Sequence, residues 1–211
     1  MNIFNRRKFL KASFLGAILG YYAKDGMALS ATPPETKGPF YPITPQKDKD
    51  FDLTSIVGKE GHAQGQIVNI HGRVIDEDSN PIVNATVDIW QANAAGRYRH
   101  PHDSNPAPLD SNFQGWAIVQ SGEKGLFKFK TIIPGAYPVS QTWTRPPHIH
   151  FKVTKRGYTE LVTQMYFPGN ELNKIDTLLK RKTKSERAQM VAKTVIGKAN
   201  TLEYTVILSS V

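Results

Sequence analysis

The sequence predicts an all-β protein: a β-sandwich of short mixed and antiparallel strands, with long loops and an extended N-terminal arm. Apolar and polar residues alternate over short stretches, as they do in strands that are buried on one face. Gly and Pro are plentiful (16 and 14 of 211 residues), which favours many turns over a helical bundle. Hydrophobic residues make up 39% of the chain, enough to bury a core and to exclude wholesale disorder.

The first 31 residues have the composition of a signal peptide. A basic start around Arg6 and Arg7 precedes a short apolar run at 14–22, and small residues follow at 28–31. The paired arginines indicate the twin-arginine export route; an ordinary secretory signal and an uncleaved anchor are the alternatives. The apolar run is shorter than a bilayer requires, so we expect no stable membrane span. The sequence therefore predicts an exported protein, periplasmic or secreted.

The charge of the chain does not point to nucleic acid. The formal net charge is +9, but the signal segment carries part of it, and a basic run at 180–184 is typical of a solvated face. No basic stripe interleaved with aromatic residues is present, so no nucleic-acid partner is expected. The absence of Cys excludes a disulfide framework, a zinc finger, a thiol nucleophile and a cysteine-ligated cluster.

After the signal, residues 32–65 are rich in Pro, Lys and Asp and are interpreted as an extended arm, followed by one domain over 66–211. Alternation predicts a pair of strands within 66–91, joined by a turn at 76–81. We expect further strands at the following positions: 127–133, 149–153, 161–167 and 204–208. Residues 93–120 are expected to form a long polar loop, which in a compact domain is usually functional or disordered. A helix is possible within 174–196, where apolar positions are sparse.

The segment Arg145–Phe151 holds the strongest chemical signal. In a strand, His148 and His150 project to the same side, while Ile149 projects into the core. Two neutral imidazoles at this spacing can bind one metal ion. A pair of surface histidines without a metal is the alternative that the pattern alone leaves open. The two prolines before His148 favour the metal site, because they rigidify the entry to the strand.

Two tyrosines stand in distinctive turns upstream of this strand. Tyr137 lies in the Pro-flanked segment Pro134–Pro138, and Tyr98 follows Gly96 and Arg97 at the start of the long loop. Taken singly, each tyrosine can equally be a core residue whose hydroxyl is hydrogen-bonded.

A second group of possible metal ligands lies within the loop. His100, His102 and Asp103 are close in sequence, but a Pro between the histidines does not hold them as a strand would, so a place at the rim of a pocket is favoured. The remaining histidines, His62 and His71, carry no signal.

Five ordered motifs resemble those of the intradiol ring-cleavage dioxygenases, and an upstream segment fits the arm that faces the substrate in that family. The motifs cover roughly residues 36 to 169, at these positions: Ile89–Tyr98, Gly125–Phe127, Pro134–Pro138, Arg145–Phe151 and Leu161–Phe167, with Gly38–Tyr41 upstream. Without a large helical N-terminal region, the chain is more similar to the protocatechuate 3,4-dioxygenase type than to the longer catechol 1,2-dioxygenases.

The resemblance implies a non-haem Fe(III) centre that opens catechol-type aromatics with O2 to cis,cis-muconate-type products. It implies four ligands: Tyr98, Tyr137, His148 and His150. Phenolate is a hard anionic donor that suits ferric iron, and a bound cation deprotonates a phenol. A set of two histidines and one carboxylate would instead favour Fe(II), and no carboxylate adjoins the paired histidines.

The resemblance also implies roles for residues around the metal. Tyr137 would leave the metal when substrate binds and accept a proton, and Arg145 would stabilise charge that develops on the ring. Gln164 would hold Arg145 or the substrate, and Pro39 would contact the substrate. The alternatives are a surface ion pair for Arg145 and an ordinary strand position for Gln164.

Two hypotheses that assign the protein to a non-enzymatic class remain as alternatives. One is a secreted β-sandwich that binds without catalysis, and the other is a structural subunit whose metal never meets substrate. The expected partners are a catechol-type small molecule and O2. A homo-oligomer is possible, since an uncovered sheet face favours association.

Overall fold

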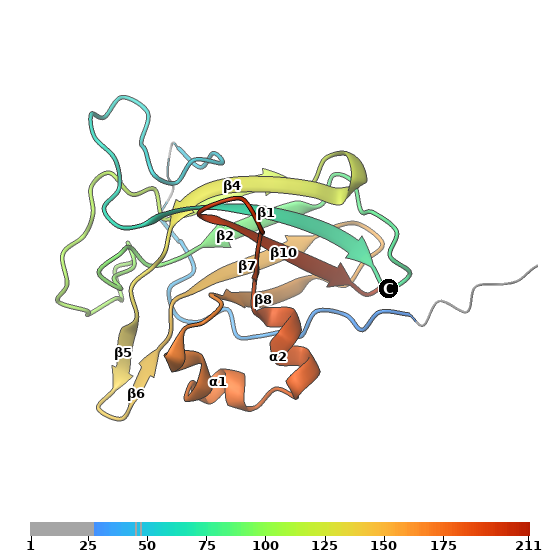
Figure 1. Cartoon of the computed structure of the whole chain (residues 1–211). Helices are drawn as coiled ribbons and strands as arrows, with labels where there is room; N and C mark the ends of the chain where they lie inside the picture. The colour runs from blue at the N-terminus through green and yellow to red at the C-terminus, as the bar shows by residue number, and fades with distance from the viewer. Residues whose placement is uncertain (1–27, 45, 47) are drawn as a thin grey trace, which may run out of the picture.

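The computed structural model describes residues 28–44, 46 and 48–211, and the expected signal peptide lies almost entirely outside them. Two four-stranded sheets pack face to face, and a two-stranded hairpin projects from one end (Figure 1). The strands are β1 Ile67–Asp76, β2 Thr86–Trp90, β3 Trp116–Gln120, β4 Leu126–Ile132, β5 Tyr137–Ser140, β6 Trp143–Arg145, β7 His148–Thr154, β8 Leu161–Tyr166, β9 Lys193–Thr194 and β10 Thr201–Leu208. The predicted all-β sandwich is confirmed.

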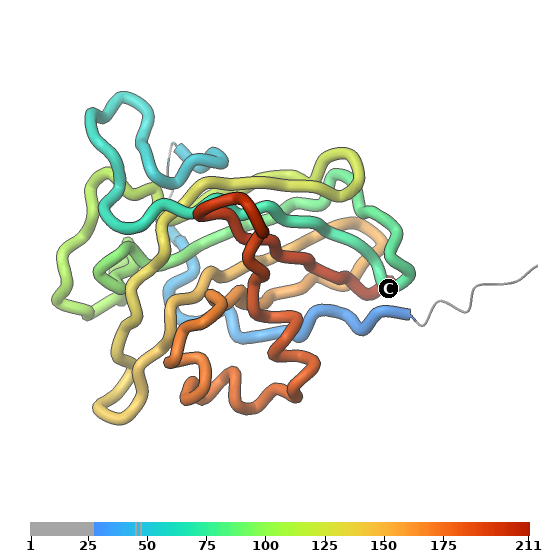
Figure 2. Tube along the Cα trace, in the orientation of Figure 1, coloured from blue at the N-terminus to red at the C-terminus, as the bar shows by residue number. Residues whose placement is uncertain are grey.

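The first sheet has the order β4-β1-β10-β9 and is mixed. Strand β1 pairs in parallel with β10, the last strand of the chain, and antiparallel with β4. The second sheet, β3-β2-β7-β8, is antiparallel throughout, with β2 and β7 at its centre. The last strand lies beside the first, so the first sheet is held together by a pairing that is distant in sequence (Figure 2).

The core lies between the two sheets and is filled by alternate residues of the strands. Phe129 of β4 and Phe151 of β7 meet across it with ring centroids 6.0 Å apart, and both are buried. Gly72 of β1 is part of this packing, because the Phe127 ring occupies the space of its missing side chain; a Cβ at position 72 would lie 1.9 Å from Phe127 Cζ. Alternation directs the other residues of the second sheet outward, where the functional site lies.

An extended segment from residue 28 to 44 crosses the outer side of the second sheet. Its backbone pairs with both ends of the sandwich: the Thr32 N–H donates to the Ile207 carbonyl, and the Glu35 N–H donates to the Val162 carbonyl. Farther along, the Tyr41 hydroxyl donates to buried Asp88 at 2.7 Å. Asp88 also accepts from Trp116 Nε1 at 2.7 Å, so one carboxylate fixes the segment to the sheet.

Two short helices lie between β8 and β9 in the chain, α1 Thr177–Lys180 and α2 Lys184–Met190, and 3-10 turns occur at Glu123–Gly125 and Glu171–Lys174. The helices lie beside β8 (Figure 1). Asp176 caps α1, and Thr183 and Glu186 form a capping box on α2. Among the described residues, no helix is both long and apolar enough to cross a membrane.

The structure corrects three expectations about the elements. The two strands expected within 66–91 form, but they do not pair: β1 and β2 belong to opposite sheets, because the turn between them carries the chain across the core. The end of the expected loop 93–120 is strand β3, and the single helix expected within 174–196 is two helices and strand β9. The β5–β6 hairpin had no sequence signal, since Pro138 and a register shift break its alternation.

Candidate metal centre and substrate cavity

His148 and His150 lie side by side on the outer face of β7. Both are buried (2% and 3% exposed), so the alternative of a surface histidine pair is wrong. Their Nε2 atoms are 3.2 Å apart. Neighbouring strands hold each ring: Trp90 of β2 stacks on His150 at 4.8 Å and 8°, and Tyr166 of β8 lies opposite His148. Two imidazoles are thus fixed by the register of three strands.

Tyr98 reaches the histidines from the loop after β2. Its hydroxyl oxygen lies 3.1 Å from His150 Nε2 and 3.4 Å from His148 Nε2, and the residue is 3% exposed. The Asp103 carboxylate accepts from the Tyr98 backbone N–H at 2.7 Å and fixes the loop there. The predicted convergence of this tyrosine with both histidines is therefore present in the structure.

Tyr137 stands at the start of β5, close to both Tyr98 and His148. Its ring centroid is 5.7 Å from that of Tyr98 and 5.7 Å from that of His148. Gly96 brings the two tyrosine segments together: with a φ of +77°, it packs so closely that a Cβ would lie 2.5 Å from the Ala136 carbonyl oxygen. A side chain at position 96 would force the segments apart.

Burial controls the protonation of the four side chains. Burial, together with the nearby Arg145 charge, lowers the pKa of His148 well below its usual range and that of His150 to about 3. Burial raises the pKa of Tyr98 well above its usual value, and it also raises the pKa of Tyr137. Without a metal, the imidazoles are neutral with available lone pairs, and the phenols are protonated. A cation would have to displace the phenol protons.

The donor set fits a single metal ion. His148 Nδ1 lies 2.7 Å from the Pro146 carbonyl oxygen, so this nitrogen carries the proton and Nε2 presents its lone pair to the centre. The three donor atoms lie 3.1 to 3.4 Å apart. Ligands about 2.1 Å from a metal at angles of about 90–109° are separated by roughly 3.0–3.4 Å. In the described part of the chain, no group of three or more His, Cys, Asp or Glu side chains could hold a metal, so tyrosine oxygen must complete any site here.

Arg145 lies beside this group and is only 4% exposed, so the alternative of a surface ion pair is wrong. Its Nε donates to Asp176 at 3.0 Å, and its Nη2 donates to Gln164 at 2.6 Å and to the Tyr166 hydroxyl at 3.0 Å. Gln164, directly opposite His150 on β8, also donates to the Thr36 carbonyl of the N-terminal segment. It therefore connects Arg145 to that segment rather than lining the cavity.

Sequence reasoning missed Asp176 and Tyr166. Asp176 is fully buried and accepts from Trp143 Nε1 and the Leu179 N–H as well as from Arg145. Nothing in the sequence distinguishes it from the other acidic residues. Tyr166 lies in a motif that the resemblance quoted, and its place two residues after Gln164 on an alternating strand could have indicated that both side chains share a face.

A cavity of about 490 Å³ opens next to the four side chains. Tyr137, His150, Arg145 and Pro39 line it, whereas Tyr98 and His148 lie behind them. Phe40 also lines the cavity, with its ring 4.9 Å from that of Tyr98. The donor atoms meet at the closed side of the cavity. The volume of the cavity suits a small aromatic molecule.

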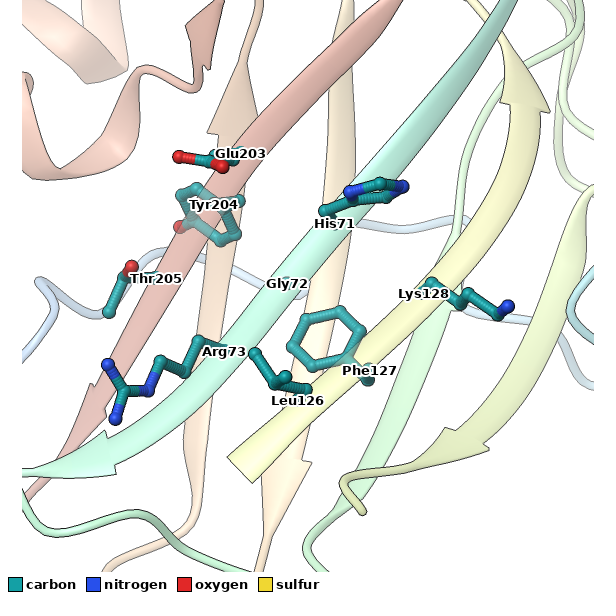
Figure 3. Close-up of a pocket in the computed structure, with 9 residues that line it drawn as sticks. All are labelled: His71, Gly72, Arg73, Leu126, Phe127, Lys128, Glu203, Tyr204 and Thr205. Carbon is teal, nitrogen blue, oxygen red and sulfur yellow. The ribbon is translucent and has the colours of Figure 1, made fainter. Parts of the chain in front are cut away.

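A larger hollow of about 630 Å³ lies on the outer face of the other sheet and contains none of the predicted site residues. Figure 3 shows its lining on β1, β4 and β10, with His71, Arg73, Lys128 and Glu203 spread along the strands rather than gathered at one point. Within the residues that the structure describes, the competing loop group of His100, His102 and Asp103 does not form a metal site either. Asp103 is engaged by the backbone N–H groups of Tyr98 and Asn105.

Comparison with known proteins agrees with this geometry. A family model described as dioxygenase matches residues 36–208. The chain is 37% identical over 178 residues to the protocatechuate 3,4-dioxygenase beta chain of Burkholderia cepacia, covering 74% of this chain and 75% of that one. The chain belongs to the intradiol ring-cleavage dioxygenase family. It is therefore an oxidoreductase, and the alternative hypothesis of a non-catalytic binding domain is wrong.

Other members differ in length from this intradiol dioxygenase. It is 32% identical to the alpha chain of the Burkholderia cepacia enzyme, over 78% of this chain and 84% of that one. It is also 32% identical to catechol 1,2-dioxygenase 2 of Acinetobacter lwoffii, but spans only 55% of that protein. The solved structure of 3-chlorocatechol 1,2-dioxygenase from Rhodococcus opacus 1CP superposes with a TM-score of 0.65 at 20% identity, over 87% of this chain and 74% of that one, which shows the shared fold.

Proposed function

We propose that this chain binds one ferric ion through Tyr98, Tyr137, His148 and His150 and opens catechol-type rings between the two hydroxylated carbons. One O2 is consumed per ring, both of its atoms enter a cis,cis-muconate-type product, and no external reductant is required. The observation that carries the proposal is the meeting of Tyr98 Oη with two imidazole Nε2 atoms within 3.4 Å, at the closed side of a cavity. When bound, a ferric ion would act as a Lewis acid and withdraw electron density from the ring of a catechol substrate.

The two tyrosines have different access to a substrate. Tyr98 is buried behind the cavity, whereas Tyr137 lines it and is partly exposed. Tyr137 Oη is therefore the group that can receive a proton from an arriving catechol hydroxyl. Tyr98 would remain a permanent ligand, because its side chain has no room to leave the buried group.

Arg145 supplies the positive charge on the cavity wall. Three acceptors fix its guanidinium: Asp176, Gln164 and the Tyr166 hydroxyl. A charge that is held in place before the reaction stabilises negative charge on the ring without reorganisation. We assign Gln164 a positioning role, since it contacts Arg145 and the N-terminal segment.

Iron loading and turnover test the proposal together. The iron-loaded protein should contain one iron per chain, show the visible absorption of tyrosinate-to-iron charge transfer, and consume O2 with catechol. Tyr98→Phe and His148→Ala should lose or shift the absorption and abolish ring opening. The matched controls Tyr158→Phe and His71→Ala, which lie away from the group, should retain both. Full colour and turnover in both site variants would contradict the ligand set.

The same experiment tests the alternative that the protein is a structural subunit that binds metal without catalysis. Iron binding with the expected colour but no O2 consumption on any catechol would favour a structural subunit. The cavity beside the donor atoms argues for access of substrate.

We further propose that the chain is exported by the twin-arginine route. Support comes from the order of basic, apolar and small residues in the first 31 positions, with Arg6 and Arg7 paired. That route carries folded proteins, which suits a domain whose iron would be bound by residues distant in sequence.

A further inference from the structure

We infer that the cavity selects uncharged catechols with an apolar ring substituent and disfavours catechols that carry a ring carboxylate. The inference rests on the proposed function and names the substrate class of the same site. It depends on three properties of the cavity: an apolar wall, a single guanidinium whose donors are already engaged, and a carboxylate in the lining.

One wall of the cavity is apolar. It is formed by Phe40 and Pro39 of the N-terminal segment, Val139 and Trp143 of the hairpin, and Leu178 of α1. Residues of both the hairpin and α1 line the cavity, and Val139 is 50% exposed. A methyl group or a halogen that points from the bound ring toward this wall would leave water for apolar contact, which is favourable.

Arg145 is the one Lys or Arg among the residues that line the cavity in the described part of the chain. Its Nε hydrogen is directed to Asp176, and the two Nη2 hydrogens are directed to Gln164 and Tyr166. Only Nη1 remains, so the two-point pairing by which arginine binds a carboxylate is not available. The Asp176 carboxylate, 3.0 Å from Nε, already balances the charge.

The lining also contains a carboxylate of its own. Asp103 is 9% exposed and accepts only backbone N–H groups in the structure, from Tyr98 at 2.7 Å and from Asn105 at 2.9 Å. Neither partner is a cation. A substrate carboxylate entering this space would lose its water and meet a like charge without gaining a counter-ion, which disfavours binding.

Three ligands of similar shape separate charge from size: 4-methylcatechol, protocatechuate and the methyl ester of protocatechuate. The ester is at least as large as protocatechuate but carries no charge. Equilibrium binding to the iron-loaded protein is measured without O2, and kcat/KM is measured with it. We expect 4-methylcatechol and the ester to bind at least tenfold more tightly than protocatechuate, and 4-methylcatechol to be opened with at least tenfold higher kcat/KM.

Protocatechuate binding as tightly as its ester, or better, would overturn the inference. If none of the three is opened, the proposed function fails, while the order of binding affinities still decides what the cavity selects. The two failures are therefore distinguishable.

Adding a cation to the wall provides the converse test. Leu178→Lys should improve protocatechuate binding at least tenfold relative to the matched apolar variant Leu178→Met, with a smaller effect on 4-methylcatechol. Val139→Lys, at an exposed position of the hairpin, gives a second variant that leaves the core untouched. Failure of both lysine variants to shift the preference toward the acid would contradict the inference.

Discussion

Replacing Asp176 with Asn should lower the free energy of unfolding by about 3–5 kcal/mol, because it leaves a buried guanidinium without its counter-ion. The side chains of Arg145 and Asp176 are 5% and 0% exposed, and their charged atoms are 3.0 Å apart. At an effective dielectric constant near 20, charges at that separation attract by about 5 kcal/mol. Asn retains one oxygen that can accept from Arg145 Nε or the Leu179 N–H, so the shape of the site is kept while the charge is removed.

The measurement is equilibrium urea unfolding followed by circular dichroism at constant iron loading. A loss of this size is a large part of the roughly 5–15 kcal/mol that stabilises a typical domain. Glu171→Gln is the matched control, since it removes a carboxylate from an exposed pair with Lys174 and should change little.

The double variant Arg145→Met/Asp176→Asn decides the cause of the loss. It removes the uncompensated cation as well, so we expect it to be more stable than Asp176→Asn alone. A loss below about 1 kcal/mol in Asp176→Asn, the range of exposed ion pairs, would refute the reasoning. So would a double variant that is less stable by the sum of the two single effects, because additivity means that the two residues are not coupled.

Three further predictions concern the core, the N-terminal segment and export. Gly72→Ala should lower the free energy of unfolding in urea by about 1–3 kcal/mol, because the new Cβ would meet the Phe127 ring. Gly122→Ala, whose Cβ would have its nearest neighbour 3.7 Å away, should cost far less. Equal effects of the two variants would contradict the packing argument. Asp88→Asn should raise KM for 4-methylcatechol by about tenfold with a smaller change in kcat. The substitution weakens the hydrogen bond that holds Tyr41, and the neighbouring Phe40 is then displaced from the cavity. An effect confined to kcat would contradict this prediction. Arg6→Lys/Arg7→Lys should retain the protein inside the cell when the fractions of the expression host are compared by immunoblot, and unchanged export would exclude the twin-arginine route.

The elements that the sequence predicted well are those whose signal is local. Alternation identified most of β1, β4, β7 and β8, and the same rule placed both imidazoles of β7 on one face and Phe151 in the core. The partners of these strands could not be predicted. Nothing in residues 66–91 says that β1 pairs in parallel with β10 or that β2 lies in the other sheet, because such pairings are decided by packing over the whole chain.

The residues of the site also differ in how far they could be predicted. His148 and His150 could be paired by periodicity. Tyr98 lies in a loop and Tyr137 begins a short hairpin without a sequence signal, so spacing predicts no direction for either side chain, and only the resemblance joined them to the histidines. Asp176 had no signal at all, since its importance comes from burial against a side chain 31 residues away.

The structure also explains why rigid strands and loops are combined at this centre. The imidazoles must keep a fixed separation to chelate one ion, and the register of β2, β7 and β8 fixes them without any loop. Tyr137, proposed above as the group that receives a proton from the substrate, instead begins a two-stranded hairpin that is attached to the second sheet by no strand pairing in the described residues. This tyrosine is therefore placed on an element that can move with little disturbance of the core, and the same hairpin carries Val139 and Trp143 of the apolar wall. Binding of a ring substituent against that wall is thus expected to be coupled to the position of Tyr137: Val139→Lys should alter the rate of the absorbance change on substrate binding as well as the preference among catechols.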